Sequence, residues 1–382
     1  MPFNGQRLKM ARIYRNMNIT ELAELVGVKK QSISQFENGI IKPKPETEYM
    51  LVRALDFPRS FFYQKALAFN IENTFFRALS STNALDKKTQ EIKTLMIVTI
   101  YNFLCEYLDL PHLNLPIISS HNIDDIETMA LNLRNYWGLG ETPIHNMVNL
   151  IENNGIITSA FDVENDKIDA FTQVHGNRPN SQYCVVVGNN KKSAVRRNFD
   201  VAHELGHIML HNDIGNIDEL TNEQFRNMEN EANQFAAAFL LPRNAFYEDL
   251  SNPQDLLSYI PLKKKWHVSI GAMIIRAKTL GRINSNEYQS LMKAISYRKW
   301  RTHEPLDDEL KIPTPTLFTS AIEVLLDNGI LTPQSFVNKL ALYCLPMKAT
   351  EIEKLLALPK NILNVATSNV IDMHSVISIK NL

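Results

Sequence analysis

The sequence predicts a mainly α-helical protein with a small β-sheet, an α+β fold, and three observations support this class. Short amphipathic segments with helical spacing fill both ends of the 382-residue chain. Three runs rich in β-branched and aromatic residues lie between them, at residues 155–161, 168–174 and 183–187. A helical segment with a His-Glu-x-x-His motif follows, at residues 196–211. This length is enough for two or three domains.

Composition and net charge are those of an ordinary globular protein. Hydrophobic residues make up 45% of the chain and the formal net charge is −1, so any surface that binds nucleic acid must be local. The first residues lack the basic-then-apolar pattern of a secretion signal. Three cysteines without a spacing pattern favour reduced thiols in the core: Cys105, Cys184 and Cys344. We therefore expect a cytoplasmic protein that does not enter a membrane.

Residues 1–65 predict an N-terminal DNA-binding domain of five short helices. The first helix covers residues 6–14. Thr20 is expected to cap the second helix, Gly27 to turn the chain, and Gly39 to end the third helix. A Glu-Leu-Ala helix, a glycine-centred turn and a helix with a polar start together form a helix-turn-helix.

The segment from Thr20 to Pro43 closely resembles the XRE or lambda-repressor-like family of helix-turn-helix proteins. It contains Thr-Glu-Leu-Ala, then Gly-Val, then Ser-Ile-Ser-Gln-Phe-Glu-Asn-Gly. In that family the start of the third helix enters the major groove, which implies base contacts from Lys30, Gln31, Ser34 and Gln35. Lysine can donate to guanine, and glutamine can pair bidentately with adenine. We expect a homodimer that binds a double-stranded DNA operator.

Other residues of this segment are expected to contact phosphates or to form the domain core. Five basic side chains are available for phosphates: Arg7, Arg12, Arg15, Lys42 and Lys44. Ile33 and Phe36 should face the core. Ile19 departs from the family pattern at a position that often makes a polar contact. An alternative is that this domain is a helical docking module that has lost DNA binding.

Segments on either side of the central domain are predicted to be helical and carry no catalytic motif. Residues 66–120 form a helical connector. Residues 301–382 form a C-terminal region of unknown role, with three short amphipathic helices and a β-branched tail at residues 365–379. The lysine run at residues 263–265, beside Trp266, is more typical of a solvated helix face than of a second nucleic-acid patch.

Residues 121–300 are predicted to form a domain organised around the His-Glu-x-x-His motif. His203 and His207 are four residues apart, so they project from one face of a helix and can bind one metal ion. Glu204 lies on the adjoining edge, where it can take a proton from water activated by the metal. This arrangement is typical of metal-assisted hydrolysis.

A third ligand is expected on the following Ala-rich helix, which Pro242 ends. Glu229 shares a helix face with Asn233, so it offers a ligand with a polar partner behind it. Glu231 is the competing candidate, but its face differs by about 200° from that of Glu229, and only one of them can face the metal. We favour Glu229. His211 continues the histidine series, but three histidines spread over about 12 Å of helix cannot bind one ion. We expect His211 to be hydrogen-bonded near the helix end or to line the cleft.

The run from Arg197 through Ala-His-Glu-Leu-Gly-His to Glu-Ala-Asn-x-Phe-Ala-x-x-x-Leu-Leu-Pro resembles the ImmA/IrrE family of zinc metallopeptidases. This resemblance implies a zincin-like domain in which His203, His207 and Glu229 hold zinc and Glu204 is the base. Members of that family cleave helix-turn-helix repressors and so switch on genes. The resemblance therefore implies a DNA-binding transcriptional regulator with a zinc-dependent endopeptidase domain, which cleaves a repressor or itself. Candidates for stabilising the oxyanion are Tyr183, His175 and His211.

Two other functions are compatible with the same motifs. The zinc domain could be a sensor or scaffold without turnover, within a transcription factor. The chain could also be an antitoxin-like or anti-repressor binding module. A purely structural metal site does not need a base beside the metal, so Glu204 favours catalysis.

Overall fold

Two compact units make up the chain. The first unit comprises Met1–Ala68, Lys88–Leu108 and Phe318–Leu382, and the second comprises Phe69–Lys87 and Asp109–Leu317. The computed structural model describes these residues: 2–67, 71–75, 83–116, 125–161, 170–176, 181–188, 193–211, 214 and 219–364. The sequence segments 66–120 and 301–382 are each divided between the two units.

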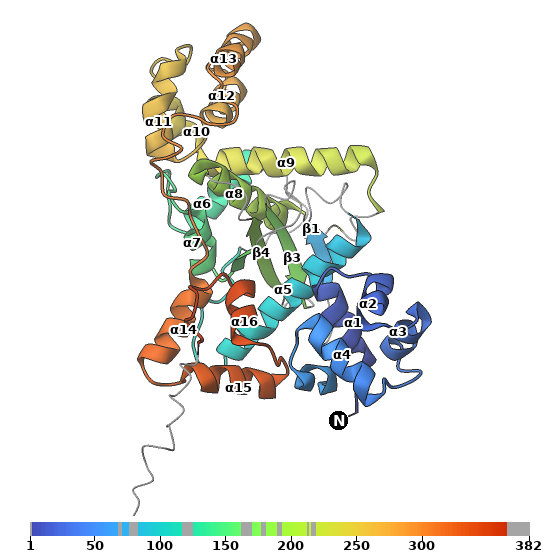
Figure 1. Ribbon diagram of the computed structural model, residues 1–382. Coiled ribbons are helices and arrows are strands. Elements are labelled where there is room, and N and C mark those ends of the chain that lie inside the picture. Colours follow the sequence, from blue (N-terminus) through green and yellow to red (C-terminus); the bar gives the residue numbers. More distant parts are fainter. Residues whose placement is uncertain are drawn as a thin grey trace, which may run out of the picture. The chain divides into compact units, whose positions relative to one another are not determined.

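The fold is mainly helical with a small sheet, which confirms the predicted α+β class. The first unit contains α1 (Gly5–Tyr14), α2 (Ile19–Val26), α3 (Lys30–Glu37), α4 (Pro45–Leu55), the 3-10 helix η1 (Arg59–Tyr63), most of α5 (Ala84–Leu104), α14 (Leu317–Asp327), α15 (Pro333–Tyr343) and α16 (Ala349–Leu355). The second unit contains β1 (Ile71–Phe75), α6 (Ile126–Tyr136), α7 (Met147–Asn153), β2 (Ile157–Phe161), β3 (Ala170–His175), β4 (Gln182–Gly188), α8 (Ala194–Leu210), α9 (Asn222–Leu240), α10 (Arg243–Asp249), η4 (Leu256–Ser258), α11 (Tyr259–Trp266), α12 (Ile270–Thr279) and α13 (Ser285–Tyr297) (Figure 1).

The cap of helix α2 lies two residues before the predicted one. Asn18 accepts hydrogen bonds from the backbone N–H groups of Thr20 and Glu21, and Glu21 accepts one from the backbone N–H of Asn18. This reciprocal pair is a capping box. The prediction that Thr20 caps the helix was wrong because Asn18 offers an equally suitable side chain with a glutamate three residues later. Gly27 ends the helix as predicted, in the left-handed conformation with φ 73°.

Three arginines predicted to contact phosphates have partners inside the first unit instead. Arg7 is fully buried and donates to the backbone oxygens of Lys65 and Cys344, at 2.7 and 2.8 Å. Arg15 pairs with Glu351 at 2.9 Å. The basic side chains were identified correctly, but residue type alone did not show that the C-terminal helices supply acceptors for them.

Arg12 makes the most complete of these contacts. Its Nε and Nη2 donate to the two carboxylate oxygens of Glu37 at 2.6 and 2.9 Å, and its Nη1 donates to the backbone oxygen of Met17 at 2.7 Å. Both side chains of the ion pair are buried. This pair joins α1 to the end of α3, the helix that is expected to read DNA.

A four-stranded sheet forms the middle of the second unit, in the order β1-β3-β4-β2. Strands β2 and β4 are parallel, whereas β3 is antiparallel to both β4 and β1. The three runs predicted to be strands are β2, β3 and β4. Strand β1 lies in residues 66–120, the segment predicted to be a helical connector, so that prediction was wrong for Ile71–Phe75. Its five residues form a strand because they pair with β3, and no local pattern reveals that partner.

Helix α8 lies on one face of this sheet and packs against α9 (Figure 1). The two helices approach each other closely at Gly206. A methyl group added to Gly206 would lie 3.1 Å from the backbone oxygen of Ala232 and 3.2 Å from the Phe235 ring. These distances are shorter than ordinary van der Waals contacts, so the facing atoms of α9 would have to shift by a few tenths of an ångström to accept a side chain there.

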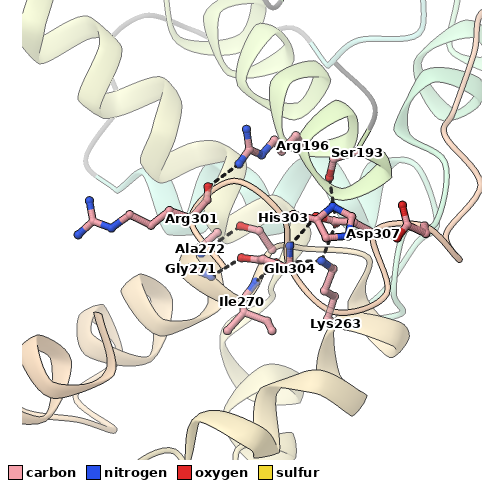
Figure 2. Close-up of polar contacts among 12 residues, drawn as sticks. Ser193, Arg196, Lys263, Ile270, Gly271, Ala272, Arg301, His303, Glu304 and Asp307 are labelled. Atoms are coloured by element: carbon pink, nitrogen blue, oxygen red, sulfur yellow. Dashed lines mark hydrogen bonds and ion pairs between the residues drawn. The ribbon is translucent and has the colours of Figure 1, made fainter. Parts of the chain in front are cut away.

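A buried cluster of charged groups joins the chain after α13 to the start of α12 (Figure 2). Lys263 is fully buried and donates from Nζ to Glu304 at 2.9 Å and to Asp307 at 2.7 Å. Glu304 also accepts hydrogen bonds from the backbone N–H groups of Ile270 and Gly271. A carboxylate at a helix N-terminus satisfies free donors and complements the helix dipole.

The same cluster also contacts α8. The hydroxyl of Ser193, the N-cap residue of α8, donates to Asp307 at 3.2 Å (Figure 2). The prediction that the lysine run is a solvated face is therefore wrong for Lys263, although Lys264 and Lys265 are exposed. Lys263 shares a helix face with the buried Trp266, three residues later.

Three further predictions concern the cysteines, membrane-spanning helices and the C-terminal tail. Among the cysteines, only Cys184 is buried, so the prediction of core thiols holds for one residue of three. None of the helices in the described part of the chain combines the length and apolar character that spanning a bilayer requires. The predicted β-branched tail, residues 365–379, lies outside the described residues.

The buried ion pair between Arg12 and Glu37 yields a stability prediction. Arg12→Ala should lower the free energy of unfolding of the first unit by about 3–5 kcal/mol, because it leaves a buried carboxylate unpaired. Chemical denaturation of the full chain measures this change, with Lys42→Ala, an exposed position, as the control. Unchanged stability together with weaker DNA binding would return Arg12 to the role of a phosphate contact.

Candidate metal centre and nucleic-acid surface

Helix α8 carries the three residues of the His-Glu-x-x-His motif on its buried faces. His203, Glu204 and His207 are each 1% exposed. The Nε2 atoms of His203 and His207 lie 3.0 Å apart, as expected for side chains one helical turn apart. Burial lowers the pKa of His207 to about 4, so its imidazole is neutral near pH 7 and can offer a lone pair.

Helix α9 brings Glu229, and not Glu231, to these histidines. One Glu229 oxygen lies 3.4 Å from His203 Nε2 and the other lies 3.3 Å from His207 Nε2. Ligand atoms from these three residues all lie within 4.8 Å of one another. Ligands held at about 2.0–2.1 Å by a tetrahedral zinc ion are roughly 3.3 Å apart, so this donor set fits that ion.

Each histidine also has a partner at its other ring nitrogen. His203 Nδ1 lies 3.1 Å from Asn233 Oδ1, whereas the sequence predicted Asn233 as the polar partner of Glu229. His207 Nδ1 lies 3.0 Å from His211 Nδ1, and His211 Nε2 lies 2.9 Å from Glu231. Burial lowers the pKa of His211 from its ordinary value. His211 is thus hydrogen-bonded at the end of α8, one of the two expected positions.

The Glu204 side chain reaches the sheet. It accepts a hydrogen bond from the hydroxyl of Thr172, in β3, at 2.7 Å. Burial raises the pKa of Glu204 to about 7, and a cation held by the neighbouring His203 would lower it again by favouring the carboxylate. Sequence patterns gave no indication of Thr172, because the register between β3 and α8 is set by tertiary packing.

The register of the strands shows which candidates for stabilising the oxyanion lie on the α8 side of the sheet. Thr172 contacts Glu204, and Val174 belongs to the same core as α8, so His175 lies on the opposite face of the sheet. Tyr183 is paired with Val174 and belongs to that core, so it lies on the α8 side. His175 is therefore excluded, Tyr183 stays a candidate, and His211 is engaged with Glu231.

A cleft of about 1130 Å³ lies beside the metal cluster, between α6, α8, α9 and α12. Arg196 and Asp200 line it from α8, and Asn233 and Gln234 line it from α9. Asn233 therefore forms part of the cleft wall and also contacts His203. The cleft is large enough to hold several residues of a peptide.

The four residues expected to contact bases lie at the start of α3. Lys30, Gln31 and Gln35 are exposed and Ser34 is half-buried. Ile33 and Phe36 are buried, as predicted. Lys42 and Lys44 are exposed, so they stay available for phosphates, in contrast to the three arginines whose side chains have partners within the first unit.

Comparison with protein-family models finds two matches in this chain. Residues 151–278 match the Peptidase_M78 model, described as the IrrE N-terminal-like domain, and residues 8–62 match a helix-turn-helix model. The first match contains α8 and α9, and the second contains α3. No curated protein matches the chain. Both predicted resemblances are thus confirmed.

The position of Glu229 yields a prediction about metal binding. Glu229→Gln should raise the zinc dissociation constant by more than about 100-fold, because it removes a direct ligand rather than an outer partner. Competition with a chromophoric chelator measures this constant in the full chain. Glu231→Gln should have a smaller effect, and the opposite order would show that Glu231 is the ligand.

The exposed face of α3 yields a prediction about DNA. Gln31→Ala should weaken operator binding by about 1–3 kcal/mol and relax base preference at one position. Lys42→Ala should weaken binding to all sequences alike, because a phosphate contact carries no base information. Fluorescence anisotropy at several salt concentrations separates the two effects. A chain that binds no duplex DNA at low salt would favour the docking-module alternative.

Proposed function

We propose that this chain, in which a helix-turn-helix match and an IrrE N-terminal-like match occur together, is a cytoplasmic transcriptional regulator with a zinc-dependent endopeptidase domain. It would bind a double-stranded DNA operator as a homodimer, because such operators usually contain two half-sites. The observation that carries the peptidase part is the position of Glu204. This carboxyl group lies beside three convergent metal ligands and is not itself one of them.

In this proposal residues 1–65 read DNA and residues 121–300 form the peptidase domain. Residues 66–120 connect these domains, and residues 301–382 have no assigned catalytic role. The helices at 318–364 belong to the same compact unit as the DNA-reading helices. They support that domain through hydrogen bonds such as the one between Tyr14 and Glu351, at 2.7 Å.

The residues present fit a zinc ion, with His203, His207 and Glu229 as its ligands. When bound there, zinc would supply a Lewis acid that activates water and polarises a peptide carbonyl. The neutral state of His207 supports this assignment, because only an unprotonated nitrogen can donate a lone pair.

Glu204 would act as the general base in peptide hydrolysis. Its carboxylate would take the proton of the attacking water and deliver it to the leaving amine. Thr172 donates to one of its oxygens, Oε2, and so leaves Oε1 available for that proton. Burial raises the pKa of Glu204 to about 7 in the metal-free site, and a bound cation would lower this pKa toward the ionised form that a base requires.

The substrate would be a repressor protein or the chain itself. A protease whose targets are repressors gains from a DNA-binding domain of its own, because tethering near operators raises the local substrate concentration. Self-cleavage is the other use of the same two domains. The alternative is a regulator whose zinc site senses or supports without turnover, and it requires the three ligands but not Glu204.

Glu204→Gln separates these functions. The variant should keep its zinc, its thermal stability and its operator affinity, and it should lose about 10²–10⁴-fold of the cleavage rate, the contribution typical of a general base. Quantitative proteomics of cells with the wild-type or variant chain measures the cleavage event, with Glu223→Gln as a surface control. Equal regulation and equal proteomes under every stress tested would establish the sensor alternative.

A further inference from the structure

The third histidine of α8 links a metal ligand to a carboxylate on α9. Its Nδ1 lies 3.0 Å from His207 Nδ1, and its Nε2 lies 2.9 Å from Glu231 Oε2. His211 is the C-cap residue of α8, with φ −118° and ψ 9°, so its backbone has left the helix. Its ring can therefore bridge His207 and α9 instead of continuing along the helix face.

The order of donors in this chain of contacts follows from counting protons. A carboxylate only accepts hydrogen bonds, so Nε2 of His211 must carry the proton that Glu231 accepts. A neutral imidazole has a single N–H, so in a neutral His211 the Nδ1 atom is an acceptor and Nδ1 of His207 donates to it. The lone pair of His207 is then on Nε2, the atom that faces Glu229 at 3.3 Å.

We propose that Glu231 and His211 form a relay that holds His207 in its metal-binding tautomer. Both are positioning residues, and the proposal rests on the zinc site of the proposed function. A carboxylate that acts on a ligand through a hydrogen bond fixes the orientation of the ring and makes its lone pair more basic. His203 has the neutral amide of Asn233 in the same position, so the relay acts on one ligand only.

The position of Glu231 supports this role. It lies on α9 two residues after Glu229, and its side chain is 48% exposed, whereas that of Glu229 is 14% exposed. Residues two apart on a helix point in different directions, so one helix supplies a ligand at the cluster and an outer partner at its side. The close approach of α9 at Gly206 places both within reach of α8.

A double-mutant cycle tests whether Glu231 acts through His211. The zinc dissociation constant of the full chain is measured by chelator competition for wild type, Glu231→Leu, His211→Phe and the double variant. Glu231→Leu should raise the constant about 10–100-fold, as loss of an outer partner does. In the His211→Phe background the same change should add less than about twofold, because coupled residues are not additive. Glu223→Leu, an exposed position on α9, is the matched control.

An equal effect of Glu231→Leu in both backgrounds would overturn the relay, since the carboxylate would then act through space. Wild-type affinity in the Glu231→Leu chain would overturn it as well. Thermal unfolding of each metal-free variant identifies any loss of affinity that comes from loss of fold.

The tautomers themselves provide a second test that does not depend on zinc. Nitrogen NMR of the metal-free full chain with labelled histidine should show Nε2–H on His211, because the carboxylate of Glu231 accepts from that atom. A spectrum with Nδ1–H on His211 would overturn the relay. If the unaltered chain binds no zinc, the proposed function fails, whereas this spectrum still decides whether the relay exists.

Discussion

Helices α8 and α9 approach closely at Gly206, and the cluster of His203, His207 and Glu229 depends on that contact. The histidines come from α8, whereas Glu229 and Asn233 come from α9, so the distance between the helix axes sets the ligand distances. A side chain at Gly206 would press on the backbone of Ala232 at 3.1 Å. Because both helices pack in one core, the arrangement of the three side chains is set by helix packing rather than by loops.

The parts of the site that sequence could predict are those that helical periodicity determines. Four-residue spacing places His203 and His207 on one face, and the 200° or so between Glu229 and Glu231 implies that only one can face them. The structure brings Glu229 to the histidines. The three strands before α8 were predictable for the same reason, since alternating β-branched residues are a local pattern.

The parts that sequence could not predict depend on contacts between distant residues. Thr172 reaches Glu204 only because β3 packs against α8 in one register. Arg12 and Lys263 are basic side chains like any others in the sequence, yet each is buried against carboxylates that lie 25 to 44 positions away. Charge shows that a residue needs a polar partner and does not show whether that partner is water, DNA or protein.

The first unit is discontinuous in sequence, which has a consequence for its synthesis. Its helix-turn-helix segment leaves the ribosome before the helices that accept hydrogen bonds from Arg7 and Arg15 are made. Arg7 and Cys344 are 337 positions apart, so the N-terminal helices are synthesised long before this partner exists. A single cut between residues 69 and 87 in the finished protein would leave the two ends of this unit joined by noncovalent contacts alone. Such a nick would convert the unit into a fragment complex whose lifetime depends on how fast its halves dissociate.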